Sequence, residues 1–231
     1  MKHMKHVQYV KQKNKRLEVE DQDDESCGQL GYSVSHMVLN NFKVNIDEPV
    51  VEPRYYREVF HMLLEAGEND IVSFFINSPG GNKNGLLTLL EGIKLTQATT
   101  KAVIVGEAHS AASILALHCD ELYVSDSATM LCHHVRYGVQ GKDADILAHA
   151  LHTSQTSSDL IKDTYKDFLS DAEIQDILSG KELWLTAEEI KERAVKRDII
   201  EAEREVQELE QEAETEVETK PTKQRAKKKN T

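Results

Sequence analysis

The sequence predicts an α/β fold in which strands and helices alternate along the chain to build a mainly parallel β-sheet. Two strand-length runs, 70–77 and 101–108, are largely apolar, as strands buried on both faces are. Segments with helical periodicity separate such runs, so parallel pairing with right-handed crossovers is expected. With 231 residues, of which 39% are apolar, the chain can form the core of one domain of ordinary size.

Each element is assigned from its own pattern of apolar, polar and turn residues. From the N-terminus we expect a strand within 36–45, a helix at 54–68, a strand at 70–77, a helix at 84–97, a strand at 101–108, a helix at 110–119 and one or two strands within 121–135. A long polar helix then runs from 143 to about 168. Capping boxes at 170–173 and 186–189 begin two more helices, with a short strand at 182–185 between them.

The two ends differ in composition from the body. Residues 1–16 hold six Lys or Arg and lead into an acidic run, while 201–219 hold nine Glu and 220–229 hold six Lys or Arg. Such charged blocks cannot bury enough apolar surface to offset their ordering entropy. We therefore expect a charged N-terminal extension at 1–30, one folded domain at 31–200 and a charged tail at 201–231. The tail is rich in good helix formers, and it is either a solvated segment or a docking segment.

Composition excludes several classes of protein. No apolar run is long enough to cross a membrane, and no apolar stretch follows the basic N-terminus, so we expect neither a membrane protein nor a secretory signal. Three cysteines without a CxxC pair favour reduced thiols over a disulfide framework. The net charge of −12 makes a nucleic-acid partner improbable. We expect a cytoplasmic globular protein.

Two strand-to-helix turns contain candidate functional residues. Gly80 and Gly81 follow a buried strand, where bare backbone N–H groups can approach a ligand closely, as an oxyanion site requires. Ser110 lies where the next strand gives way to a helix of small residues, a place where a serine nucleophile gains access to substrate. The plainer alternatives are an ordinary turn and a helix cap, respectively. Ser113, one turn further on, is expected to pack inside.

Two adjacent histidines, His133 and His134, end the strand region that follows. A histidine at a strand end can act as general base toward a serine, but neighbouring strand residues face opposite ways, so at most one can point at Ser110. A metal-binding or structural role is the alternative, using these histidines with His118, Cys119 and Cys132. Their spacing matches no standard zinc pattern.

Taken in order, these motifs resemble the Clp protease proteolytic subunit, a serine peptidase, and in particular its shorter phage-type relatives. The matching stretches are INSPGG at 76–81, GEAHSAAS at 106–113, LCHH at 131–134, VQGKDADILAHA at 139–150 and ELWLTAEE at 182–189. The resemblance covers about residues 35–200 and implies the crotonase-like spiral of ββα units. The helix from Asp143 is then the protruding "handle" of that fold.

The resemblance also assigns roles to individual residues. It implies Ser110 as nucleophile and His133 as base, with His134 one register away, because the family's usual proline after the histidine is missing here. Glu182 falls where the family has its aspartate, and Asp176 is the second choice. The family's oxyanion donors fall on Gly80, Gly81 and Ala111. This implies acyl transfer to a serine without a metal or an organic cofactor.

Partners follow from the same resemblance. It implies a homo-oligomer of seven-membered rings stacked in pairs, which cleaves peptide or protein substrates and is fed by a Clp-type ATPase. The alternative within proteolysis is a phage-type maturation protease that acts on assembly proteins, in the host cytoplasm. Outside proteolysis, a crotonase-like acyl-CoA enzyme would keep the oxyanion site but lack the paired serine and histidine.

Overall fold

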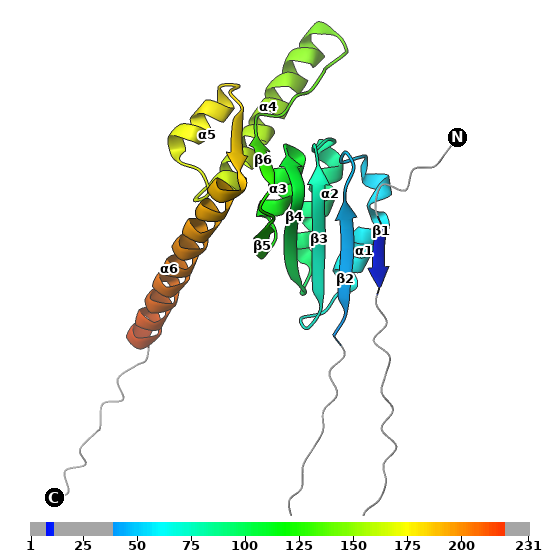
Figure 1. The fold of residues 1–231 in the computed structure, drawn as a ribbon. Coiled ribbons are helices and arrows are strands. Elements are labelled where there is room, and N and C mark those ends of the chain that lie inside the picture. The colour runs from blue at the N-terminus through cyan, green and yellow to red at the C-terminus, as the bar shows by residue number, and fades with distance from the viewer. Residues whose placement is uncertain (1–7, 12–38, 220–231) are drawn as a thin grey trace, which may run out of the picture.

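The computed structural model of the chain describes residues 8–11 and 39–219, which form one sheet and the helices around it (Figure 1). Most of the expected extension at 1–30, including Cys27, lies outside the described residues, as does the end of the expected tail from 220 onward. No helix in the described ranges is long and apolar enough to cross a membrane.

The sheet is mainly parallel, as the alternation of strands and helices predicts. Its strands are β1 (Gln8–Lys11), β2 (Asn41–Ile46), β3 (Ile71–Ser78), β4 (Thr99–His109), β5 (Glu121–Val124), β6 (Thr129–Cys132) and β7 (Leu183–Thr186). The order is β1-β2-β3-β4-β6-β7, and β5 pairs with β4 beside this path. The pairs from β2 to β6 are parallel, whereas β1 and β7 join antiparallel at the two edges.

Strand β4 pairs with two strands, β5 and β6, at successive positions along its length. Its residues 101–104 pair with β5, and its residues 107–109 pair with β6. The N–H of Ser110 extends this second ladder by donating to the carbonyl of Leu131 at 2.8 Å. The end of β4 and the end of β6 therefore lie side by side, and the segments that follow both strands begin at the same place.

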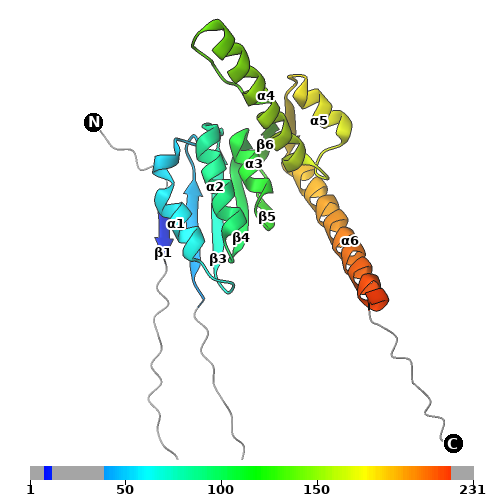
Figure 2. The ribbon, with the colours of Figure 1, turned by 180° about the vertical axis from the view of Figure 1, so that it is seen from behind.

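One face of the sheet is covered by three helices, α1 (Arg57–Glu65), α2 (Lys83–Leu95) and α3 (Ala111–Leu117) (Figure 2). A 3-10 turn, η1 (Pro53–Tyr55), precedes α1. The core lies between these helices and the sheet, and its fully buried side chains include Leu63, Leu89, Phe74, Ile104 and Leu115. Burial of this kind stabilises the fold by roughly 1.5–3 kcal/mol for each large apolar side chain.

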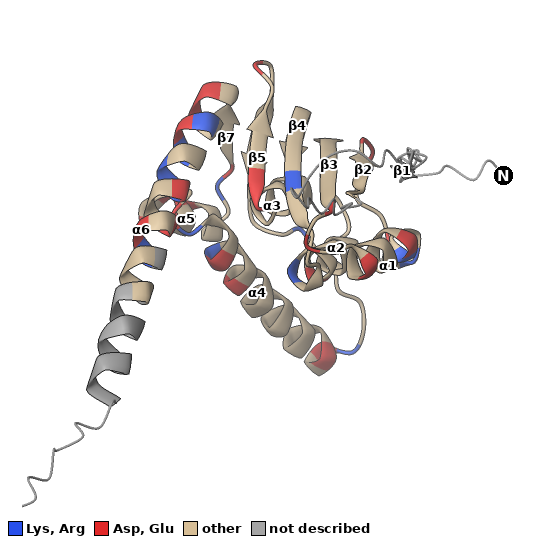
Figure 3. Cartoon of the chain, turned by 90° about the horizontal axis from the view of Figure 1, so that it is seen from below, with Lys and Arg blue, Asp and Glu red and all other residues tan. Residues whose placement is uncertain are grey.

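The remaining helices, α4 (Asp143–Tyr165), α5 (Asp171–Leu178) and α6 (Ala187–Thr219), lie at the β7 end of the sheet. Only the second half of α4 has buried residues, and its first half projects beyond the body, with Leu147 and Leu151 more than 60% exposed. Charged residues colour much of α6, whereas the strands are mostly neutral (Figure 3). Helix α6 continues through Glu201, so the expected domain boundary at 200 falls inside a helix.

Most expected elements are present, with changes at their ends. The region 121–135 forms two strands, and both capping boxes are made, with Ser170 and Thr186 each bonded to the glutamate three residues later. The long helix stops at Tyr165, short of residue 168. The helix ends because Lys166 leaves the helical region with a ψ of 139°, and Asp167 follows it in the left-handed region with a φ of 64°.

Candidate active site

Ser110 occupies a strained turn between β4 and α3. Its φ of 56° and ψ of −121° form a conformation that non-glycine residues rarely adopt and that costs on the order of 1–3 kcal/mol. As the residue that precedes α3, Ser110 could cap the helix, yet its hydroxyl makes no capping bond to the described backbone. The plainer interpretation of this serine, as a helix cap, is therefore not what the structure shows. Ser110 instead lines a pocket.

The two-glycine turn after β3 packs directly against Ser110. A Cβ atom on Gly80 would lie 2.8 Å from the Cβ of Ser110 and 2.4 Å from the carbonyl oxygen of His109. A Cβ on Gly81 would lie 2.3 Å from the carbonyl oxygen of Val50. Gly80 (φ 84°) and Gly81 (φ 150°) also adopt backbone conformations that suit glycine. No other residue type allows this close approach of backbone to backbone.

This turn leaves backbone donors free beside Ser110. Val50 bonds to Gly80 and Asn82 in a parallel bridge, which directs the N–H of Gly81 away from Val50. The N–H of Gly80 donates to the hydroxyl of Ser78 at 3.2 Å. Of the three expected oxyanion donors, Gly81 and Ala111 thus have N–H groups with no acceptor among the described residues, and these two can bind an oxyanion.

His133 and His134 follow β6 and separate from each other, as their alternation along a strand predicts. His133 lines the same pocket as Ser110, whereas His134 lies 3.5 Å from the hydroxyl of Ser158 on α4. The Nδ1 of His133 lies 2.6 Å from the carbonyl oxygen of His134. A carbonyl can only accept, so Nδ1 carries the proton of this bond and Nε2 of a neutral His133 has a free lone pair.

His109, which directly precedes Ser110, is the second histidine that lines this pocket. Its Nδ1 lies 3.1 Å from the carboxylate of Glu107, and its Nε2 lies 3.0 Å from the hydroxyl of Thr129. Its ring also packs edge-on against Trp184. Both ring nitrogens of His109 are engaged, whereas Nε2 of His133 has no hydrogen-bond partner among the described residues.

The two candidate acids are each engaged with a cation. Glu182 is ion-paired with Arg136, and Asp176 is ion-paired with Lys181 at 2.8 Å. Glu182 borders a shallow hollow together with His133, whereas Asp176 does not. In the described part of the chain, neither carboxylate is hydrogen-bonded to His133. The hydroxyl of Ser110 is not hydrogen-bonded to His133 either. The structure thus brings Glu182 near His133 without joining the two.

The pocket itself has a volume of about 390 Å³ and lies between the two turns and α4. Its apolar lining includes Leu86, Ile114 and Leu160, and two cations, Lys83 and Arg136, also border it. None of these residues could be selected from the sequence, because their meeting in one pocket depends on tertiary packing between elements that are far apart in the chain.

Beneath the pocket, a buried chain of hydrogen bonds links the turn at Ser110 to α4. The hydroxyl of Ser113 donates to the carbonyl of Ser110 at 2.7 Å, so it accepts from the hydroxyl of Tyr165, also at 2.7 Å. Burial raises the pKa of the Cys132 thiol to about 12. Ser113 packs inside, as expected. The two hydrogen bonds hold the turn at Ser110 to the end of α4.

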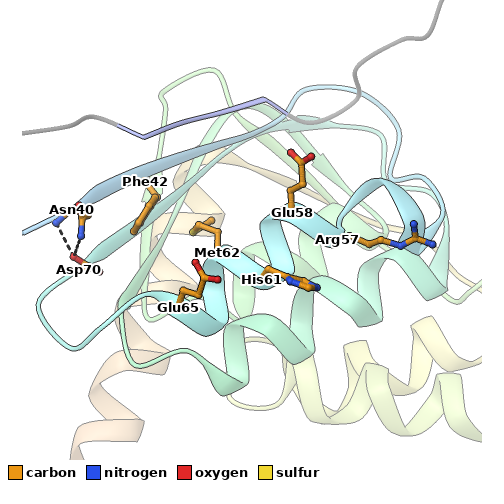
Figure 4. A pocket seen from close by; sticks show the side chains of 8 residues that line it. All are labelled: Asn40, Phe42, Arg57, Glu58, His61, Met62, Glu65 and Asp70. Atoms are coloured by element: carbon orange, nitrogen blue, oxygen red, sulfur yellow. Dashed lines mark hydrogen bonds between the residues drawn. The ribbon is translucent and has the colours of Figure 1, made fainter.

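A second pocket, of about 440 Å³, lies between α1 and the neighbouring strands (Figure 4). Its lining includes His61, Arg57 and Glu65 but no serine, threonine or cysteine. It therefore offers no side-chain hydroxyl or thiol for covalent catalysis. Among the described residues, no group of three or more His, Cys, Asp or Glu side chains is arranged to hold a metal ion.

Comparisons with known proteins agree with this architecture. The family model described as Clp protease matches residues 26–219 of the chain. The ATP-dependent Clp protease proteolytic subunit 1 of Chlamydia muridarum is 24% identical over 167 residues, which are 69% of this chain and 86% of that protein. The matches confirm the resemblance seen in the motifs, the predicted α/β fold and the enzyme class, a serine-type peptidase. The chain belongs to the Clp protease family.

Proposed function

We propose that the chain is an endopeptidase in which Ser110 is the nucleophile and His133 is the general base. One observation carries the proposal: Ser110 sits in a strained turn, free of capping bonds, in a pocket that also contains His133. The free N–H groups of Gly81 and Ala111 lie beside it. A nucleophile, a base and oxyanion donors are the set that acyl transfer to a serine requires.

In the proposed reaction, the Oγ of Ser110 attacks the peptide carbonyl carbon while its proton passes to Nε2 of His133. The carbonyl oxygen becomes an oxyanion that accepts from the N–H groups of Gly81 and Ala111. His133 then gives the proton to the leaving amine as the C–N bond breaks. A water molecule, deprotonated by His133, attacks the acyl-enzyme, and the proton returns to Ser110 as the acid product leaves.

Glu182 remains the proposed third member of the catalytic set. The carbonyl of His134 already selects the tautomer that leaves Nε2 free, which is one task of the acid in a serine protease. A carbonyl bears no full charge, so it stabilises the imidazolium less than a carboxylate does. In this proposal Glu182 supplies that charge, either without a direct hydrogen bond to His133 or after it exchanges Arg136 for the histidine.

Assembly and partners form a further part of the proposal. The exposed leucines Leu147 and Leu151 on the projecting half of α4 would be buried where two rings stack, and seven-membered rings follow from the family resemblance. The name of the Chlamydia relative includes ATP dependence, which supports a Clp-type ATPase as partner. Processing of phage assembly proteins is the alternative. A cytoplasmic location belongs to the same proposal.

The assignment of the base is tested by the variants His133→Ala and His134→Ala, assayed for cleavage of a fluorogenic peptide. His133→Ala should lower kcat/KM by about 10³-fold or more, because no other free imidazole lines the pocket. His134→Ala is the matched control, since it keeps the backbone carbonyl that accepts from His133. Retained cleavage in His133→Ala, or its loss only in His134→Ala, would reject the assignment.

A further inference from the structure

Lys83 is a partly buried cation in the wall of the pocket that contains Ser110. It is the first residue of α2, three positions after Gly80, and its Nζ donates to the hydroxyls of Thr156 at 3.1 Å and Ser157 at 2.9 Å. Both partners lie on α4 and are neutral. An ammonium group has three N–H donors, so one donor of Lys83 is left over. Partial burial lowers the pKa of Lys83.

The other cation of this pocket differs from Lys83 in having a carboxylate partner. Arg136 pairs with Glu182. No aspartate or glutamate lines the pocket, and Lys83 forms no ion pair with any described residue. A charge that has lost part of its hydration without gaining an opposite charge is stabilised by any anion that enters the site.

We propose that this pocket accepts a glutamate side chain of the substrate, at the residue whose carbonyl Ser110 attacks, and that Lys83 binds its carboxylate. The inference rests on the proposed function and names the substrate class of that site. The apolar lining of Leu86, Ile114 and Leu160 suits the two methylene groups of a glutamate. A pocket of about 390 Å³ holds such a side chain easily. Lys83 is then a specificity residue and takes no part in the proton transfers.

The test uses two peptides that differ only in charge, one ending in Glu and one in the isosteric Gln. Binding is measured by fluorescence anisotropy in the Ser110→Ala background, so that it does not depend on catalysis. The Glu peptide should bind about tenfold more tightly than the Gln peptide, the effect of about one charge-assisted hydrogen bond. Adding Lys83→Met should abolish this preference. Lys83→Arg, which keeps the charge, should retain most of it.

Lys94→Met is the matched control, because Lys94 lies at the other end of α2 and does not line the pocket. It should keep the tenfold preference. Equal binding of the two peptides, or an equal loss of both in Lys83→Met, would overturn the inference and leave Lys83 as a structural link to α4. Loss of fluorophosphonate labelling in folded Lys83→Met with Ser110 intact would also overturn it, since Lys83 would then belong to the catalytic machinery.

Failure of the proposed function is seen separately. If the wild-type protein takes up no fluorophosphonate, the role of Ser110 fails, whereas the difference in binding between the two peptides still decides the role of Lys83. In an active enzyme the same preference should appear as a higher kcat/KM for peptides with Glu before the scissile bond, and raised salt should reduce it.

Discussion

Replacement of Gly80 by alanine tests whether the two-glycine turn holds the nucleophile in place. The new Cβ would lie 2.4 Å from the carbonyl oxygen of His109 and 2.8 Å from both Ala111 N and the Cβ of Ser110. Real Cβ atoms do not approach other atoms so closely, and two of the three contacts are to backbone atoms. The turn must therefore move away from Ser110, and the backbone at position 80 must also accept an unfavourable φ of 84°.

The size of the effect follows from two contributions. A non-glycine residue in the left-handed region costs about 1–2 kcal/mol, and overpacking of a tight site costs about 1–3 kcal/mol more. Gly180→Ala separates the two contributions, because Gly180 has a φ of 98° but no atom within 4 Å of the new Cβ. We expect Gly80→Ala to lower the free energy of unfolding by about 1–3 kcal/mol more than Gly180→Ala does.

The assay combines urea unfolding at fixed protein concentration with the rate of labelling by a fluorophosphonate probe. Displacement of the turn shifts the oxyanion donors relative to Ser110, so labelling of Gly80→Ala should slow by about 10²-fold even where the protein remains folded. Gly180→Ala should label at the wild-type rate. Equal destabilisation by the two variants, or an unchanged labelling rate in Gly80→Ala, would refute the reasoning.

Three further predictions concern the surroundings of the site. Tyr165→Phe and Ser113→Ala should each lower the free energy of unfolding by about 1 kcal/mol, with a coupling energy of at least about 0.5 kcal/mol in the double-mutant cycle. Additive effects of the two substitutions would contradict the hydrogen bond between these side chains. Hydrogen bonds from Arg193 lower the pKa of Glu173 to about 2, below its ordinary 4.5, so the pair stabilises the fold above about pH 5 and loses this effect as the pH falls toward 2. As the pH falls over that range, the melting temperature of Glu173→Gln should thus fall less steeply than that of the wild type. Parallel curves of melting temperature against pH for the two proteins would contradict the stabilising role of the pair. In a Cys27→Ser variant, the buried thiols of Cys119 and Cys132 should resist a thiol reagent at about pH 8 until the chain is unfolded, and fast reaction in the native state would show that they are accessible.

The order of strands and helices could be predicted from the sequence because it depends on local patterns. The buried strands β3 and β4 are largely apolar runs, and the capping boxes at Ser170 and Thr186 need only the residues within one helical turn. The end of the long helix could not be predicted, since it depends on non-helical conformations of Lys166 and Asp167 that no neighbouring proline or glycine requires.

Part of the candidate site could also be predicted, in particular Ser110 and the glycines of the turn against it, whose residue types suit a tight turn. The sequence could not show which of the three candidate oxyanion donors, Gly80, Gly81 and Ala111, have a free N–H group. The N–H of Gly80 is bonded to Ser78, and the bridge to Val50 leaves that of Gly81 free, and both depend on tertiary structure. The pairing of Glu182 with Arg136 and the link from Tyr165 to Ser113 join residues more than 40 positions apart. No local sequence pattern predicts contacts between residues that are so far apart in the chain.

The most direct test of the proposed mechanism is to label the protein with a fluorophosphonate and to locate the adduct by mass spectrometry. Ser113→Ala is the matched control for Ser110→Ala, since it removes a hydroxyl three residues away, on the helix α3 that follows Ser110. We expect an adduct on Ser110 in the wild type and in Ser113→Ala, and none in Ser110→Ala. An adduct that persists in Ser110→Ala, or a folded wild-type protein that takes up no label, would contradict the assignment of Ser110 as nucleophile.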